Sequence, residues 1–191
     1  MGKFIVGVII GFLLVPAGFY LYIRSGHAPV ATSAPPMPFE EYFANTALHA
    51  ALNRAAPKTR TTKASDGELL AGVEVYRHHC GLCHGLPGKP RSGIAKGEFP
   101  PPPPLFEPDH MVTDDPVGVT YWKVKHGIRL TGMPGFHATL TDEQIWNVSL
   151  LLANADKMPP DVSQALAAPF GPPPPASPPT QPAAKTNRGR K

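Results

Sequence analysis

The chain has 191 residues, of which 26 are proline and 17% are charged, so a large share of it cannot form regular structure. The formal net charge of +4 is uneven: residues 1–64 carry +4, residues 65–157 carry −3 and residues 158–191 carry +3. A nucleic-acid groove needs positive charge on the folded surface. The positive charge here lies in the flanks of the chain, and residues 65–157 are negatively charged, which disfavours a nucleic-acid partner. The two cysteines exclude a disulfide scaffold and a four-thiolate zinc site.

The first apolar segment predicts a transmembrane anchor over residues 1–24. Residues 4–23 contain no charge, and as a helix they match a hydrocarbon core of roughly 30 Å. A cleaved signal sequence is the alternative, although its apolar core is usually shorter, about 7 to 15 residues, and is followed by a small-x-small site. The closest such site, Thr32-Ser33-Ala34, is followed directly by Pro35, so an uncleaved single-pass anchor is favoured.

Residues 25–64 are interpreted as a proline-rich tether with one short helix, residues 39–56, inside it. That helix packs on the domain, lies at the membrane surface or docks a partner. Residues 158–191 contain ten prolines and end in four basic side chains, so they are predicted to be a disordered tail.

The compact domain is predicted over residues 65–157 with three main helices and no strand, which makes the fold class all-α. The first helix runs from Asp66 to His78 behind a Ser65/Glu68 capping box. The second has Asp115 as N-cap, Pro116 as first helical residue and Gly127 as its stop. The third begins at Thr141, with Gln144 completing a second capping box, and ends near Asn154.

Both cysteines occur in the motif Cys80-Gly81-Leu82-Cys83-His84. CxxCH is the attachment signature of c-type haem, in which two thiols bond the porphyrin vinyl groups and the adjacent histidine binds iron. A thioredoxin-like redox pair, half of a zinc site and a plain disulfide are the alternatives.

The candidate sixth ligand is Met133, in the sequence TGMPGF, where glycine allows a close approach to a flat ring and proline stiffens the loop. A thioether suits low-spin iron beside histidine. Met111 is the rival, without such a loop. His78, His79, His126 and His137 are interpreted as structural or surface residues.

Three motifs together, CGLCH, GMPGF and TDEQIW, make residues 65–157 resemble a class I monohaem cytochrome c. The resemblance implies a cytochrome c fold around one haem c, attached through Cys80 and Cys83 with His84 and Met133 as axial ligands. It also implies a close crossing of the first and last helices, to which Gly72, Tyr76 and Trp146 correspond. A proline carbonyl, one of Pro100 to Pro104, is expected to accept the Nδ1 proton of the ligand histidine.

With both axial positions filled, the expected function is a membrane-tethered electron carrier with no catalytic residues and no small-molecule substrate. The resemblance implies the bacterial cytoplasmic membrane with the domain in the periplasm, and redox proteins of a membrane electron-transfer chain as partners. Two alternatives remain: an obligate haem subunit of a membrane dehydrogenase or oxidase, and a haem sensor or peroxidase in which Met133 is not a ligand.

Overall fold

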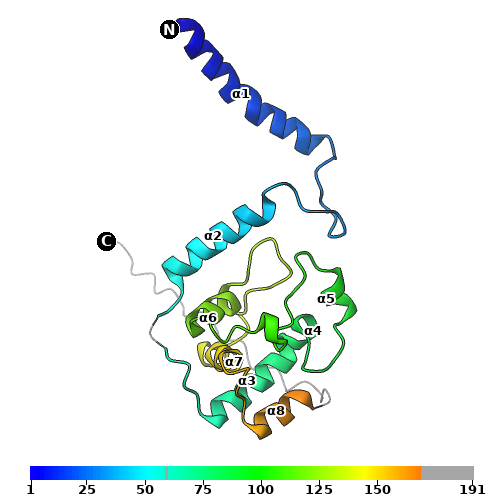
Figure 1. The fold of residues 1–191 in the computed structure, drawn as a ribbon, viewed down its shortest axis with the longest axis vertical. Helices are drawn as coiled ribbons and strands as arrows, with labels where there is room; N and C mark the ends of the chain where they lie inside the picture. Colours follow the sequence, from blue (N-terminus) through cyan, green and yellow to red (C-terminus); the bar gives the residue numbers. More distant parts are fainter. Residues whose placement is uncertain (59, 169–191) are drawn as a thin grey trace, which may run out of the picture. The chain divides into compact units, whose positions relative to one another are not determined.

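The computed structural model describes residues 1–58 and 60–168, and every regular element in that part of the chain is helical (Figure 1). The all-α prediction is therefore confirmed. The chain divides into two compact units, with the boundary between residues 47 and 48. The elements in chain order are α1 Gly2–Arg24, α2 Glu40–Ala55, α3 Asp66–His79, α4 Gly81–His84, α5 Gly93–Gly97, the 3-10 helix η1 Pro108–His110, α6 Val117–His126, α7 Asp142–Ala153 and α8 Pro160–Ala167.

Helix α1 is long and apolar enough to cross a bilayer, and it is the one such helix among the described residues. None of its side chains is buried within the protein, whereas a core helix of similar hydropathy would be covered. A helix that is apolar all round and left uncovered is suited to a membrane environment. A signal sequence near an N-terminus has the same properties, so α1 supports both interpretations.

The two predicted capping boxes are both present. Ser65 Oγ accepts a hydrogen bond from the backbone N–H of Glu68 at 3.3 Å, and Glu68 Oε2 accepts one from the N–H of Ser65 at 2.9 Å. At α7, Thr141 Oγ1 accepts from the N–H of Gln144, whose Oε1 accepts from the N–H of Thr141. Each pair satisfies two backbone donors that a helix start leaves free.

Helix α6 begins one residue later than predicted. Pro116 is the N-cap and Val117 the first helical residue, so Asp115 is not the cap. Proline lacks an N–H, and the start of a helix tolerates this because its first N–H groups have no intrahelical acceptor. The C-terminal stop is at Gly127, as predicted, with a φ of 68° that favours glycine.

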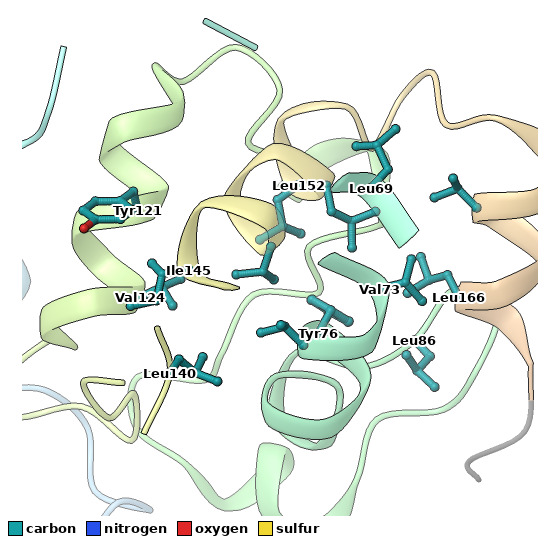
Figure 2. Packing of buried hydrophobic residues seen from close by; sticks show 14 residues of the cluster. Leu69, Val73, Tyr76, Leu86, Tyr121, Val124, Leu140, Ile145, Leu152 and Leu166 are labelled. Atoms are coloured by element: carbon teal, nitrogen blue, oxygen red, sulfur yellow. The ribbon is translucent and has the colours of Figure 1, made fainter. Parts of the chain in front are cut away.

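Helices α3 and α7 cross closely at the centre of the domain. A Cβ on Gly72 would collide with the backbone carbonyl oxygen of Asn147 and touch Cβ of Leu151, so only glycine fits at this crossing. One turn on, Tyr76 is fully buried and donates a hydrogen bond to the carbonyl of Gly85 at 2.8 Å. Figure 2 shows the core around this crossing, with side chains contributed by α3, α6, α7 and α8.

The described residues of segment 57–64 are not a free linker, in contrast to their predicted role in the tether. The carbonyl of Pro57 lies so close to Gly118 that no Cβ could be added there. Asn154 Nδ2 donates to the carbonyl of Thr62 at 3.0 Å, which ties the segment to the end of α7. The linker composition was misleading because it does not reveal these backbone contacts, nor the ion pair of Arg60 with Glu68 at 2.7 Å.

The predicted disordered tail is wrong for its first part, where α8 forms. Val162 and Leu166 of α8 are both fully buried, and they join the core cluster that includes α3. Arg77 of α3 donates to the carbonyls of Ala165 and Ala168, at 2.6 and 2.8 Å, at the C-terminal end of α8. Two buried aliphatic side chains one turn apart thus outweigh the proline-rich composition. The rest of the predicted tail, 169–191, lies outside the described residues.

Candidate haem-binding site

The CxxCH motif occupies the tight junction between α3 and α4. Cys80 closes α3, with its N–H bonded to the carbonyl of Tyr76 at 2.8 Å, and it also begins α4. Its own carbonyl accepts hydrogen bonds from the N–H groups of Cys83 and His84, at 3.1 and 2.9 Å. This single turn holds two thiols and an imidazole within five consecutive residues.

A cleft brings the four predicted haem-binding residues together. Its empty space is about 660 Å³, including the part open to solvent, which is within the size range of prosthetic-group sites. Apart from a few polar side chains, the lining consists of proline rings and apolar groups. The lining residues are His79, Cys80, Cys83, His84, Glu98, Pro100, Pro101, Pro102, Pro103, Val124, Ile128, Thr131, Gly132, Met133, Pro134 and Phe136.

His84 is held in a defined tautomer by the proline run. Its Nδ1 lies 2.8 Å from the carbonyl oxygen of Pro103. Pro103 is therefore the proline of the run that supports the histidine. Because a carbonyl can only accept, Nδ1 carries the proton and Nε2 keeps its lone pair in the neutral ring. Burial lowers the pKa of His84, despite the opposing effect of the Pro103 bond, so the imidazole is neutral at pH 7. A neutral imidazole with a free Nε2 is the form that binds iron.

The Met133 loop is braced against the end of α6. Gly127 and Gly135 pack backbone to backbone: a Cβ on Gly127 would lie 2.5 Å from the N of Gly135, and one on Gly135 would lie 2.7 Å from the carbonyl oxygen of His126. Within the loop, the carbonyl of Met133 accepts from Ile128 N–H at 3.2 Å. These contacts fix the backbone of Met133 at the edge of the cleft.

Met111, the rival ligand, is not among the cleft-lining residues. It follows η1 as the C-cap residue, with an extended backbone, and is partly buried. The structure thus brings Met133, and not Met111, to the cleft that His84 lines.

The pKa values of the two thiols distinguish among the alternatives for the CxxCH motif. Burial, and secondarily the charge of Cys83, raises the pKa of Cys80 to about 12. Burial also raises the pKa of Cys83, with Glu98 adding to the effect. A reactive redox pair needs a thiolate, which a raised pKa disfavours. The described residues contain no group of three or more His, Cys, Asp or Glu side chains placed to hold a metal ion.

Glu98 is a cleft residue that the sequence analysis did not identify. Cys83 Sγ donates a hydrogen bond to Glu98 Oε1 at 3.1 Å, and a Cβ on Gly132 would collide with the same carboxylate. Glu98 thus bridges the cysteine turn and the methionine loop. No spacing motif marks it, because it reaches the cleft only through the path of the loop between α5 and the proline run.

Of the other histidines, His79 is exposed, as predicted, and it also borders the cleft, with its ring 5.7 Å from that of Phe136. Burial, and then the charge of His78, lowers the pKa of His79. His78 pairs with Glu74 at 3.4 Å, and the exposed His126 lies with its ring 5.0 Å from that of Trp122, at an interplanar angle of 44°.

The residues present fit a covalently attached haem: two thiols, an imidazole with its Nε2 available and a thioether share one largely apolar cleft. Residues 67–150, which are under half of the chain, match the family model described as cytochrome C oxidase, cbb3-type, subunit III. No curated protein and no solved structure matches the chain significantly.

Proposed function

We propose that residues 67–150, which match the family model, are a class I monohaem cytochrome c domain and that the chain is a membrane-tethered carrier of single electrons with this domain in the periplasm. A cytochrome c domain implies electron transfer through haem. The observation that carries the finer proposal is the convergence of Cys80, Cys83, His84 and Met133 on one cleft.

Each of these residues has a distinct proposed role. Cys80 and Cys83 would hold haem c through two thioether bonds, and His84 and Met133 would be the ligands of its iron. When bound, the haem supplies a one-electron ferric/ferrous couple. With His84 and Met133 both as ligands, no coordination position would be open to a substrate, and the chemistry supplied would be outer-sphere electron transfer.

The solvent-exposed side of the cleft is the proposed route for electrons. Gly132 and Pro134, on either side of Met133, are exposed, and Leu130 in the same loop is 94% exposed with a φ of 62°. A left-handed leucine that projects into water is a strained and costly arrangement, and such outliers gather at functional surfaces. We infer that Leu130 contacts the redox partners.

The membrane placement rests on α1 and on the resemblance. An uncovered apolar helix of 23 residues is suited to a single-pass anchor. Haem c attachment outside the cytoplasmic membrane, implied by the resemblance, supports an N-terminus inside and a domain in the periplasm. Because residues 48–64 belong to the compact unit, the segment available as a tether is residues 25–47, shorter than the composition predicted. Tethering raises the local concentration of the carrier near membrane partners.

A second candidate function is an obligate haem subunit of a membrane dehydrogenase or oxidase. The matched family model is itself described as an oxidase subunit, and exposed aromatic residues lie at the start of α2. Phe39, Tyr42 and Phe43 are each about two-thirds exposed or more, which is unusual for aromatic residues outside an interface. Purification in mild detergent separates the candidates: a subunit co-purifies in fixed stoichiometry, and a carrier does not.

Haem staining after denaturing electrophoresis tests the attachment. The wild-type band should stain, and the Cys80→Ala/Cys83→Ala double variant should not. Each single variant should retain one thioether bond and partial staining. An unstained wild-type chain, produced alongside a functioning haem-attachment system, would overturn the proposed function.

A further inference from the structure

The proline run beside His84 depends on outside donors for its shape. Pro100 to Pro104 have no backbone N–H, so the run cannot brace itself with backbone hydrogen bonds of its own. Its carbonyls nevertheless remain strong acceptors. Arg91 supplies a donor: its Nη2 lies 2.7 Å from the carbonyl oxygen of Pro102, the residue before the one that accepts from His84.

Arg91 precedes helix α5 and is held in place by a contact with that helix. The same Nη2 lies 3.4 Å from the carbonyl of Ala95, which is fully buried. The next residue, Ser92, caps α5 by accepting from Ala95 N–H at 3.1 Å and donates to the carbonyl of Leu82 at 2.6 Å. Leu82 lies inside the CxxCH turn. Three hydrogen bonds, joined by the chain between neighbouring residues, therefore connect the turn that carries His84 with Ser92, Arg91 with the proline run, and that run with His84.

We propose that Arg91 is a positioning residue that keeps the Pro103 carbonyl on Nδ1 of His84 and thereby sets the electron donation of the imidazole. The proposal rests on the proposed function, in which His84 binds the haem iron. A carbonyl that accepts the Nδ1 proton makes a histidine ligand more basic, which favours ferric iron and lowers the reduction potential. Without Arg91 the Pro103 carbonyl is held less firmly on Nδ1, and the histidine becomes less basic. The ferric state is then less stabilised, so the reduction potential rises.

The charge of Arg91 has the opposite effect, which makes the proposal distinguishable from simple electrostatics. A cation near the iron disfavours the ferric state, so removing it alone would lower the potential. A rise in potential on neutralising Arg91 therefore cannot come from the lost charge.

The test compares Arg91→Met and Arg91→Lys with the matched control Lys89→Met, in the full-length haem-containing protein in detergent. Lys89 is exposed and two residues away, so its neutralisation changes the charge without touching Pro102. Two quantities are measured: the reduction potential, and the rate at which the Nδ1 proton of His84 exchanges with deuterium by NMR.

Arg91→Met should raise the potential and speed Nδ1 exchange by at least tenfold. Arg91→Lys, which keeps the charge but loses the planar fork, should speed exchange to an intermediate degree, and Lys89→Met should leave it unchanged. A lowered potential in Arg91→Met with unchanged exchange would overturn the proposal in favour of a charge effect. If Arg91→Met does not fold, exchange in Arg91→Lys decides alone: a wild-type rate contradicts the proposal. A wild-type protein without an iron-bound His84 would instead overturn the proposed function.

Discussion

Gly72 of α3 lies directly against the backbone carbonyl of Asn147 on α7, at the crossing that organises the whole domain. Gly72→Ala should lower the free energy of unfolding by about 1–3 kcal/mol, because a methyl group must push two packed backbones apart. Chemical denaturation of the purified protein measures this loss.

Gly67→Ala, in the same helix, is the matched control. No atom lies within 4 Å of its added Cβ, so the substitution should leave stability unchanged or raise it by up to about 1 kcal/mol. Equal effects at the two positions would show that the crossing is not as close as the structure has it.

Gly127 should be required for two reasons: its positive φ and the close approach of the Met133 loop to its backbone. Gly88 and Gly127 have nearly the same φ, 67° and 68°, but only Gly127 faces a neighbouring backbone. Gly88→Ala should cost about 1–2 kcal/mol through backbone strain. Gly127→Ala should cost about 1–3 kcal/mol more and should weaken the absorption band of methionine-bound ferric iron. An intact band in Gly127→Ala would contradict the role of this close approach.

Leu166 tests whether α8 belongs to the core. It is fully buried, so Leu166→Ala should lower the free energy of unfolding by about 2–5 kcal/mol. Gln164→Ala in the same helix is exposed and should change it by less than about 0.5 kcal/mol. If the two variants unfold at the same denaturant concentration, α8 does not stabilise the domain.

Asp142 gives the stability a dependence on acid pH. A hydrogen bond from Lys125 Nζ, at 2.8 Å, and one from Tyr121 Oη, at 2.9 Å, hold the pKa of Asp142 below its ordinary value. A lowered carboxyl pKa contributes stability that is complete above the unfolded-state pKa, near 4, and is lost as pH falls through the folded-state value.

Because the Asp142 side chain is two-thirds exposed, Asp142→Asn should cost less than about 1 kcal/mol at pH 7 and progressively less toward pH 2. Glu143→Gln, in the same helical turn, is the comparison and should show a smaller loss at pH 7. A deficit in Asp142→Asn that stays constant from pH 7 to pH 2 would be inconsistent with this ion pair.

Local signals in the sequence predicted most of the domain. The Ser65 and Thr141 capping boxes fixed the starts of α3 and α7, because a cap depends on residues only three positions apart. The CxxCH motif and the glycines around Met133 identified the four candidate site residues for the same reason. The assignment of those residues as haem attachment points and ligands remains a prediction.

Features that depend on distant contacts were missed. Helix α8 is stabilised by burial against α3, about 90 residues earlier, which proline-rich composition conceals. Segment 57–64 is held by backbone carbonyls and by contacts of Arg60 with Glu68 and with the ring of Trp146. These contacts depend on the folded positions of their partners, so the composition of the segment does not reveal them. Glu98 reaches the cleft, and Arg91 reaches the proline run beside it, through the course of an irregular loop, and neither has a spacing motif.

The most direct test of the central claim is the absorption spectrum of the purified protein, with carbon monoxide added to the reduced form. The proposed His84 and Met133 ligation predicts the weak red band of methionine-bound ferric iron, its loss in Met133→Ala, and no carbon monoxide binding by wild-type ferrous haem. A wild-type spectrum without that band, together with carbon monoxide binding, would contradict the electron-carrier function and favour a haem sensor or peroxidase.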